Sequence, residues 1–570
     1  MKQHPIKFFE KHKIEPRDVQ HHVLDAVYKN WDNFKYFALS CPTGVGKTYI
    51  ATSIADSVDN AYMLTSTLSL QDQYMKSWSS LINLKGRSNY TCGINSSFTV
   101  DAAPCTANKD LYTDCVKTNR CPYIVQKNLA LNSKAMITNP VYMLYSTHCG
   151  FAADEEDATW LQRSVLIFDE AHNLENHLVS FSESNINPQK LHDDHGVNTL
   201  DIIFTGKIEE DYMKVLEIKE ILSLKAEELA KKLEQEFPKS SIFGMSPKEW
   251  ARGFTSKAAD KVKKLNNKIY QLDKDIQPIN IFFATHSTTD ELSARWIISK
   301  QKDENILKLA PLYGDFLFHE YFQKLAKKFV FLSATLGSKK EFCKELGIDE
   351  SECFFIETDS PFNPSLSPII SMPSIRLSKD VYDKNVKKTG KLIDEILNIH
   401  PNERGIIHSS TYDIGKHIYQ GVSETNRKRL LFRDMDILNE LSCDKLIYSK
   451  KYKNDELIEI HEISGGEYGS VLLSPSMMEG IDLHDDLATF QVIIKLPWAN
   501  LGDVRVKIKS DIDGDWYTNK MWLSILQASG RSTRHETDSS ITYILDQKFK
   551  YFYDIWKNKL PPWFKNRIVF

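Results

Sequence analysis

The sequence predicts an α/β protein with two parallel-sheet domains. Short apolar runs such as "KYFALS" (35–40) and "VLIFDE" (165–170) are each followed by a polar or glycine-bearing turn and then by a helical pattern. Apolar strands that alternate with helices are typical of parallel sheets, whose functional residues lie at the carboxyl ends of the strands. Further runs of this kind occupy 61–66, 329–335, 404–410, 470–475, 490–497 and 541–546, and they fall into two sets.

Length and composition fit a protein of several domains. The chain has 570 residues, of which 42% are hydrophobic and 26% are charged, and this length exceeds one ordinary core. It contains no apolar run of about 18 residues, so we expect no transmembrane helix. The start, "MKQHPIKFFEKHKIEPR", carries charges where a signal peptide needs an apolar stretch, which favours a cytoplasmic protein. The net charge of −4 gives no overall attraction to nucleic acid.

A helical hairpin is predicted within the first domain, between about residues 177 and 315. Apolar residues there follow three- and four-residue spacing in two groups, separated near Pro238. The groups are Leu222, Ala226, Leu229, Leu233 and Phe237, then Phe254, Ala258, Val262, Leu265, Ile269 and Leu272. Lysines on the second helix fit a path for a nucleic-acid strand and fit a solvated helix face equally well.

A phosphate-binding loop is predicted at "CPTGVGKT" (41–48), which follows a strand and opens a helix. In such a loop the backbone N–H groups cradle phosphates, Lys47 reaches the β/γ oxygens, and the Thr48 hydroxyl binds Mg²⁺. Cys41 replaces the usual first glycine of the pattern, but the strand–loop–helix context is kept. The expected nucleotide contacts are Pro42, Thr43, Gly44, Val45, Gly46, Lys47 and Thr48.

Two carboxylates end the strand at 165–170. Asp169 can hold Mg²⁺, and Glu170 is placed to orient or deprotonate an attacking water. Paired with Lys47 on the same sheet, these residues predict a nucleoside-triphosphate hydrolase.

Four of the nine cysteines, Cys92, Cys105, Cys115 and Cys121, lie between the phosphate loop and this strand. In a reducing compartment, clustered thiols bind metal more often than they pair. The spacing C-x12-C-x9-C-x5-C lacks the C-x2-C pair of zinc modules. A metal staple would replace the core that this short, polar segment cannot build. The other cysteines outside the loop, Cys149, Cys343, Cys353 and Cys443, are expected to be packing thiols.

Further segments resemble superfamily 2 helicases. "SAT" (333–335) follows a strand, and "QASGRSTR" (527–534) resembles their last motif. Charge that develops on the γ-phosphate needs cations from across a cleft, so Gln527, Arg531 and Arg534 would complete the site when the two domains close.

More narrowly, the chain resembles the iron–sulfur helicases of the XPD/DinG family over nearly its whole length. The resemblance rests on "LKGRSNYTC" (84–92), "CPY" (121–123), "DEAHNLE" (169–175), "FLSATL" (331–336), "SPF" (360–362), "MMEGIDLHDD" (477–486) and "KLPW" (495–498). It implies two RecA-like motor domains, with a cluster domain and a helical arch inserted in the first. The boundaries we expect are 1–85, 132–177 and 316–375 for the first motor domain, 86–131 for the cluster domain, 178–315 for the arch and 376–570 for the second motor domain.

The resemblance also implies roles for single residues. Arg17 and Gln20 would lie on the adenine side of ATP, and Asp482 would link the strand to the nucleotide pocket. The expected contacts to a nucleic-acid strand are Thr65, Thr67, Gln73, Ser409 and Ser410. The four clustered cysteines would hold a [4Fe–4S] cluster.

The function implied is an ATP-dependent DNA helicase that travels 5′→3′ as a monomer and splits duplex at the cluster domain. Its cofactors would be ATP, Mg²⁺ and the cluster, and its partners single-stranded and forked duplex DNA, or an RNA–DNA hybrid, with no membrane. One alternative is a translocase that strips proteins or RNA from DNA. Another is a non-catalytic scaffold, which should have lost Lys47 or Glu170, yet both are present. The pathway, whether repair or replication, and any loading partner stay open.

Overall fold

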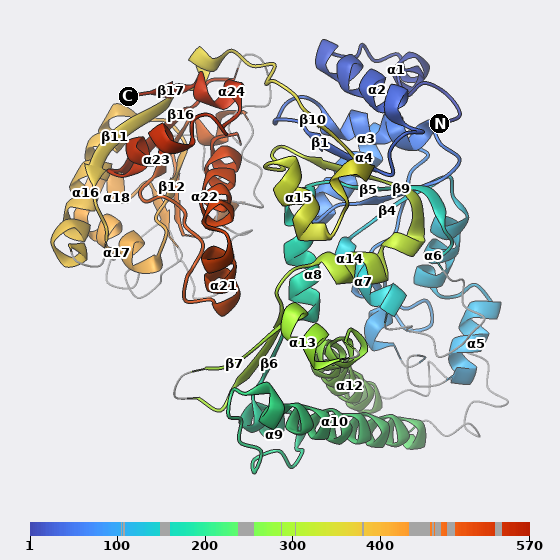
Figure 1. Cartoon of the computed structure of the whole chain (residues 1–570). Helices are drawn as coiled ribbons and strands as arrows, with labels where there is room; N and C mark the ends of the chain where they lie inside the picture. The colour runs from blue at the N-terminus through green and yellow to red at the C-terminus, as the bar shows by residue number, and fades with distance from the viewer. Residues whose placement is uncertain are drawn as a thin grey trace.

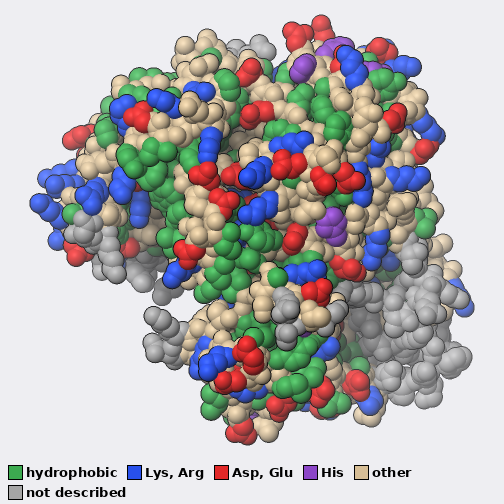
Figure 2. Space-filling model, in the orientation of Figure 1, with side chains coloured by type: hydrophobic (Ala, Val, Ile, Leu, Met, Phe, Trp, Pro, Cys, Tyr) green, Lys and Arg blue, Asp and Glu red, His purple; other side chains and the backbone are tan. Residues whose placement is uncertain are grey.

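The computed structural model describes residues 1–103, 105, 109–148, 160–236, 256–286, 288–301, 304–378, 381–432, 457–458, 461, 469–475, 485–530 and 538–570. Two α/β bodies lie side by side, and a helical projection extends below the first (Figure 1). No helix within these residues is long and apolar enough to cross a membrane. Basic and acidic side chains are interspersed over the face shown in Figure 2.

Seven parallel strands of the described chain form the first sheet, in the order β10-β1-β9-β5-β2-β4-β3. They are β1 (Tyr36–Ser40), β2 (Ala61–Leu64), β3 (Ile82–Asn83), β4 (Ala135–Thr138), β5 (Arg163–Phe168), β9 (Ala326–Ser333) and β10 (Cys353–Glu357). Every residue of β1 is buried, because helices cover both faces of a parallel sheet and its central strands are therefore apolar throughout. The four runs predicted for this domain all form strands.

The helices of this domain follow the alternation that the sequence predicts. They are α1 (Lys7–His12), α2 (Asp18–Asn30), α3 (Lys47–Asp56), α4 (Leu68–Ser77), α7 (Pro140–His148), α8 (Leu174–Ser182), α14 (Asp315–Tyr321) and α15 (Lys339–Leu346). The cysteine-bearing insertion contains the short turns η1 (Arg87–Asn89) and η2 (Val100–Ala102), then α5 (Lys109–Lys117) and α6 (Pro122–Asn132).

The second sheet is also parallel, with the described strands in the order β13-β14-β12-β15-β16-β11-β17. They are β11 (Ile369–Ile375), β12 (Gly405–His408), β13 (Leu430–Phe432), β14 (Val471–Ser474), β15 (Phe490–Ile493), β16 (Ile541–Asp546) and β17 (Ile568–Val569). The helices are α16 (Tyr382–Ile399), α17 (Tyr412–Gly421), α18 (Glu424–Arg427), α21 (Val504–Ile512), α22 (Gly514–Ser529), α23 (Phe549–Trp556) and α24 (Pro562–Lys565).

One expected boundary differs from the structure. We expected 316–375 to belong to the first domain, but β11 (Ile369–Ile375) pairs with β16 and β17 of the second sheet. The chain therefore crosses between the domains before Ile369. An apolar strand that sits next to the crossing gives no local signal of which sheet it will join, because the choice depends on distant pairing partners.

The predicted hairpin is formed by α10 (Ile208–Glu236) and α12 (Ser256–Ala284), which pack against each other. Phe237 and Phe254, also expected to belong to it, lie outside the described residues. Its base holds an antiparallel sheet that the sequence analysis did not predict. The remaining elements are β6 (Ser184–Ile186), β7 (Trp296–Lys300), β8 (Leu307–Pro311), α9 (Pro188–His195) and α13 (Thr289–Arg295).

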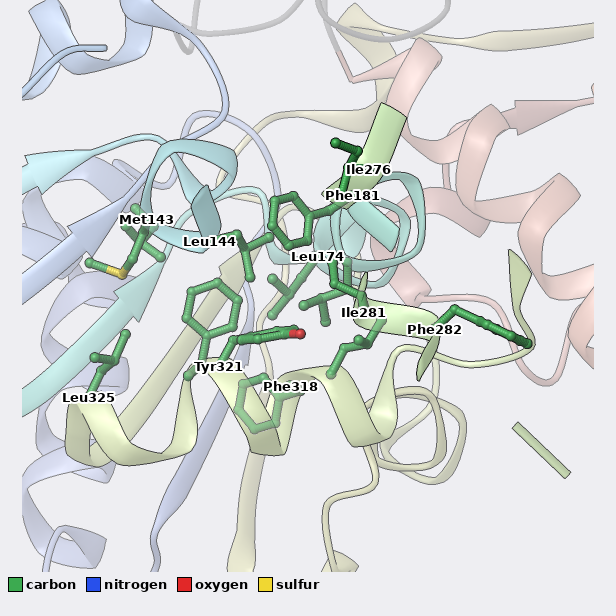
Figure 3. Close-up of a cluster of buried hydrophobic side chains, with 14 of the residues drawn as sticks. Met143, Leu144, Leu174, Phe181, Ile276, Ile281, Phe282, Phe318, Tyr321 and Leu325 are labelled. Carbon is green, nitrogen blue, oxygen red and sulfur yellow. The ribbon is translucent and has the colours of Figure 1, made fainter. Parts of the chain in front are cut away.

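A continuous apolar core joins this arch to the first sheet (Figure 3). Ile281 and Phe282 of α12 lie in the same buried cluster as Leu174 of α8 and Phe318 of α14. Since each of these side chains is at most 2% exposed, the base of the arch is part of the first domain's core.

Three hydrogen bonds from one buried arginine fix the start of β5, the strand that Asp169 follows. The Arg163 guanidinium, 3% exposed, donates to the carbonyls of Ala61 (2.7 Å), Ala130 (2.9 Å) and Leu131 (2.9 Å). Its cation also lies 4.3 Å from the Tyr62 ring centroid. One side chain therefore joins β5 to β2 and to the end of α6.

Replacing Arg163 with Met is expected to lower the free energy of unfolding by about 3 kcal/mol, because three buried carbonyls lose their donor. The matched control is Lys327→Met, an exposed lysine next to the residue that pairs with Arg163 in β9. Urea unfolding followed by circular dichroism measures both variants. Equal losses in the two would contradict the anchoring role of Arg163.

Candidate functional site: a phosphate loop facing a second domain

The phosphate loop connects β1 to α3, as the sequence predicts. Gly46 is the N-cap of α3 (φ 84°), and Gly44 has φ 79°. A Cβ at Gly44 would lie 1.8 Å from the Phe362 ring, so only glycine fits beneath this aromatic side chain. The loop therefore places its backbone at the N-terminus of α3, where N–H groups and the helix dipole favour an anion.

Arg17 and Gln20 support this loop through its backbone. Arg17 donates from Nη1 to the Gly44 carbonyl, and Gln20 donates from Nε2 to the Val45 carbonyl (2.9 Å). Gln20 is also bound by the backbone N–H of Arg17 (2.9 Å), which fixes the start of α2. The two residues expected on the adenine side thus contact the loop that carries Lys47.

The two carboxylates stand at the carboxyl end of β5. Tyr74 Oη donates to Asp169 Oδ2 (2.9 Å), and the Glu170 backbone N–H donates to Asp169 Oδ1 (3.0 Å). Burial raises the pKa of Asp169 to about 6, with a further rise from Glu170 and an opposing effect of Lys47. Lys47 is therefore close enough to act on this carboxylate, as the shared sheet edge predicts.

Glu170 occupies a strained backbone conformation. Its φ is 51°, a left-handed value that side chains other than glycine rarely adopt. Ser410, a predicted strand contact in the second domain, has φ 66°. Backbone strain of this kind costs of order 1–3 kcal/mol and gathers at functional sites, so its presence at both residues supports their assignment.

A chain of hydrogen bonds leads from the DEAH segment to the second domain. His172 Nδ1 lies 2.8 Å from Ser333 Oγ, and Ser333 contacts Thr335 of the same SAT motif (3.0 Å). Gln527 Nε2 of α22 reaches Thr335 Oγ1 at 3.4 Å. The three motifs that resemble helicase motifs therefore meet in space.

The phosphate loop also touches the second domain directly. Thr43 Oγ1 donates to the Gly530 carbonyl (2.8 Å), at the centre of "QASGRSTR". Arg531 and Arg534 follow Gly530 and lie outside the described residues, as does Asp482. The buried Arg567 donates hydrogen bonds to the carbonyls of Ser529 (2.9 Å), the residue before Gly530, and Ser367 (2.7 Å).

A buried ion network joins the two domains beside this site. Glu175 Oε1 of α8 accepts hydrogen bonds from Arg505 (2.6 Å) and Lys509 (2.7 Å) of α21. Glu345 of α15 binds Lys520 (2.8 Å) and the Trp516 indole (2.8 Å) of α22. The sequence analysis missed these partners, since a charged helix such as "VRVKIKSDI" resembles a solvated surface.

The charges of this network are retained at neutral pH. Burial would raise the pKa of Glu345, but Lys520 and Lys509 outweigh it and lower that pKa to about 2. Burial lowers the pKa of Lys509 to about 8, against the attraction of Glu175 and Glu345. Both Glu345 and most of the Lys509 population are therefore charged at pH 7.

The predicted strand contacts divide into two groups. Thr67 caps α4 and accepts from the Leu70 N–H (3.2 Å), and Gln73 is exposed on the same helix. Thr65 and Ser409, by contrast, are 0% exposed, so in this conformation their side chains are inside the protein. Thr65 directly follows β2, and Ser409 directly follows β12. The sequence pattern does not show whether the side chain of such a residue points into the protein or toward solvent.

The four clustered cysteines are all buried. They are free thiols, between 3% and 9% exposed. A hydrogen bond from Cys115, together with burial, raises the pKa of Cys105. Burial raises the pKa of Cys121, and the Cys105 and Cys92 thiols add to this rise. Gly93 supports this packing, since a Cβ there would lie 1.9 Å from the Arg120 carbonyl.

The donor set fits an iron–sulfur cluster in its chemistry, with four sulfurs in a buried place. Within the described residues, however, no three His, Cys, Asp or Glu side chains are already arranged as a metal site. Cys343 and Cys353 are buried in α15 and β10, as packing thiols should be, and Cys149 and Cys443 lie outside the described residues. The cysteine insertion also meets the arch, where Asn266 Nδ2 donates to the carbonyls of Ala102 and Ala103 (both 3.3 Å).

Parts of this chain are similar to known protein families. Residues 393–567 match the helicase C-terminal domain family, and residues 13–193 match the family of the Type III restriction enzyme, res subunit. A solved structure named XPD helicase is similar over 98% of this chain and 100% of its own, with a TM-score of 0.61 and 14% identity, which shows a shared fold. In fold and motif order, the chain resembles the XPD/DinG-like proteins of helicase superfamily 2.

Two curated relatives of this chain carry the name ATP-dependent DNA helicase CHL1. The protein of Vanderwaltozyma polyspora is 23% identical over 79% of this chain and 58% of its own length. The protein of Candida albicans is 28% identical over 24% of this chain and 19% of its own length. The chain thus spans less than two thirds of these relatives.

Replacing Glu175 with Gln is expected to lower the free energy of unfolding by about 3 kcal/mol, because Arg505 and Lys509 keep buried charges and lose their nearest counter-charge. Glu183→Gln is the matched control, since Glu183 is a partly exposed acid bound to Lys308 (3.0 Å) and should cost less than about 1 kcal/mol. Urea unfolding followed by tryptophan fluorescence compares them, with Trp516 at the interface as reporter. A Glu175→Gln loss no larger than that of the control would contradict this account.

Proposed function

We propose that this protein is an ATP-dependent DNA helicase. The observation that carries the proposal is the Thr43–Gly530 hydrogen bond, which puts the phosphate loop of one domain against the "QASGRSTR" motif of the other. Superfamily 2 motors need these two motifs to face each other, because they hydrolyse ATP in a cleft that two domains complete. The names of the CHL1 relatives and the XPD-like fold support the same activity.

The chemistry assigned to each residue follows from the site geometry. Lys47 and the N–H groups of the loop bind the phosphates, and Glu170 orients the attacking water. Thr48 and Asp169 would hold a Mg²⁺ ion, whose chemistry is to neutralise the β- and γ-oxygens. Arg17 and Gln20 hold the loop in shape through its carbonyls.

The second domain supplies the remaining groups in this proposal. Gln527 already contacts Thr335, and Arg531 and Arg534 follow on the same segment, so we assign them to the γ-phosphate. Asp482 is assigned to the link between the strand and the nucleotide. Closure of the cleft during each hydrolysis cycle would move one domain along the strand relative to the other.

We place single-stranded DNA across both domains, with Thr67, Gln73 and Ser410 as contacts and Thr65 and Ser409 shaping the backbone beneath it. Travel is proposed to be 5′→3′ by a monomer, and the cysteine insertion is proposed as the wedge at a forked duplex. Its contact with Asn266 of the arch supports a rigid wedge. An RNA–DNA hybrid is a second candidate substrate, and repair and replication are the candidate pathways.

We also propose that Cys92, Cys105, Cys115 and Cys121 hold a [4Fe–4S] cluster. The burial of all four thiols supports this assignment. The cluster would supply the cross-links that order a segment of little apolar content. A reducing compartment such as the cytoplasm would keep these thiols available.

Replacing Lys47 with Ala is expected to reduce DNA-stimulated ATP hydrolysis by about 100-fold or more, since the phosphates lose their main cation. Lys327→Ala, at an exposed lysine, is the control and should match wild type. Unwinding is measured on forks that carry only a 5′ or only a 3′ single-stranded tail, and activity should require the 5′ tail.

Three other results would redirect the proposal. Hydrolysis that survives in Lys47→Ala would overturn the mechanism. Unwinding from the 3′ tail alone would reverse the polarity. ATP hydrolysis on single strands with no unwinding of either fork would favour a translocase that displaces proteins or RNA.

Anaerobically purified protein is expected to be brown and to contain about four iron atoms per chain. Cys105→Ser should lose most of this iron and the visible absorbance, while Cys343→Ser, at a buried thiol elsewhere in the first domain, should keep both. Iron analysis and absorbance spectra are the measurements. A colourless, iron-free wild type with full unwinding activity would end the cluster proposal.

A further inference from the structure

Tyr74 is a buried tyrosine whose hydroxyl lies between the two candidate metal ligands. Its side chain is 1% exposed, and its Oη donates to Asp169 Oδ2 at 2.9 Å. Burial raises the pKa of Tyr74, and the nearby Thr48 side chain acts in the opposite direction. The phenol therefore contacts the carboxylate that follows β5 and lies near the Thr48 side chain of α3, although it belongs to neither element.

Tyr74 belongs to α4, the helix that carries the candidate strand contacts. Thr67 caps the start of α4, Gln73 is exposed on it, and Tyr74 follows directly on the buried side. A strand held at Thr67 and Gln73 would thus press on the same short, rigid helix whose other face contacts the nucleotide site. The two sites are separated by less than two helical turns, since ~3.6 residues make one turn.

The packing of α4 leaves one buried polar group unsatisfied. Gln71 is 0% exposed, and both its amide nitrogen and its amide oxygen find no hydrogen-bond partner among the described residues. A buried amide without partners is costly, and native proteins rarely keep one. A small shift of α4 would change the surroundings of this group, so the position of the helix bears on the energy of this amide.

We propose that Tyr74 is a positioning residue that couples strand binding on α4 to Mg²⁺–nucleotide binding at Asp169 and Thr48. This inference rests on the proposed function and adds a regulatory link to it. The phenol orients the carboxylate from one side while the Glu170 N–H orients it from the other. A group that orients a metal ligand in this way typically changes metal affinity about 10–100-fold when it is removed.

Coupling between two binding sites is reciprocal, which gives a measurable quantity. If strand binding tightens Mg²⁺–nucleotide binding by some factor, the nucleotide tightens strand binding by the same factor, typically about 5–150-fold. Loss of the Tyr74 hydroxyl should remove this factor from both sides. A purely structural role would change stability and leave the factor in place.

The test is Tyr74→Phe, which deletes the hydroxyl and keeps the ring. Binding of a fluorescent ATP analogue is measured with Mg²⁺ and with EDTA, each with and without a poly-dT oligonucleotide, beside Mg²⁺ titrations of ATP hydrolysis. The expected result is an about 10–100-fold higher Mg²⁺ requirement, unchanged binding in EDTA, and a coupling factor within about twofold of one.

Tyr62→Phe is the matched control. Tyr62 lies in β2 of the first sheet and is also 1% exposed. Its hydroxyl donates to the Leu161 carbonyl (2.8 Å), away from the nucleotide site. It should lose similar stability while the Mg²⁺ requirement and the coupling factor stay as in wild type. A Tyr74→Phe protein that keeps both wild-type values would overturn the inference.

A second measurement covers the case in which Tyr74→Phe does not fold. 3-Fluorotyrosine placed at position 74 retains the hydroxyl, and its ¹⁹F resonance should shift both on addition of Mg²⁺–nucleotide and, separately, on addition of poly-dT. A resonance that fails to respond to the oligonucleotide would overturn the coupling. Failure of the proposed function is distinguishable, because wild type would then show no Mg²⁺-dependent hydrolysis at all.

Discussion

Two buried carboxylates join helices of the first domain to helices of the second. Glu175 binds Arg505 and Lys509, and Glu345 binds Lys520 and the Trp516 indole, so first-domain helices α8 and α15 are joined to α21 and α22. The motif contacts at Thr43 and Gln527 follow from this arrangement. Charges buried in this way are stable only as a complete set, because a lone partner would keep an uncompensated charge.

Much of the fold follows from local pattern. Apolar runs that end in polar turns predicted the central strands, and three- and four-residue spacing predicted α10 and α12, because periodicity directly reflects which face is buried. The assignment of β11 to a sheet, and the antiparallel sheet under the arch, depend on pairing between distant segments. Local sequence contains no record of these pairings.

The candidate site divides in the same way. The residues of "CPTGVGKT" and "DEAH" could be predicted because phosphate chemistry restricts both residue type and spacing. The burial of Thr65 and the contact made by Tyr74 could not, since a tyrosine on an amphipathic helix is most simply explained as core. The cysteines are intermediate, since their number suggested a common ligand, but only the folded structure shows that all four thiols are buried.

Arg567 gives the end of the described chain a part in the nucleotide cleft. Its buried guanidinium grips the Ser529 carbonyl, one residue before the glycine that touches the phosphate loop, and it also binds Ser367 in the interdomain crossing. A change that removes the Arg567 guanidinium would therefore be felt at the nucleotide cleft, although this residue belongs to none of the motor motifs.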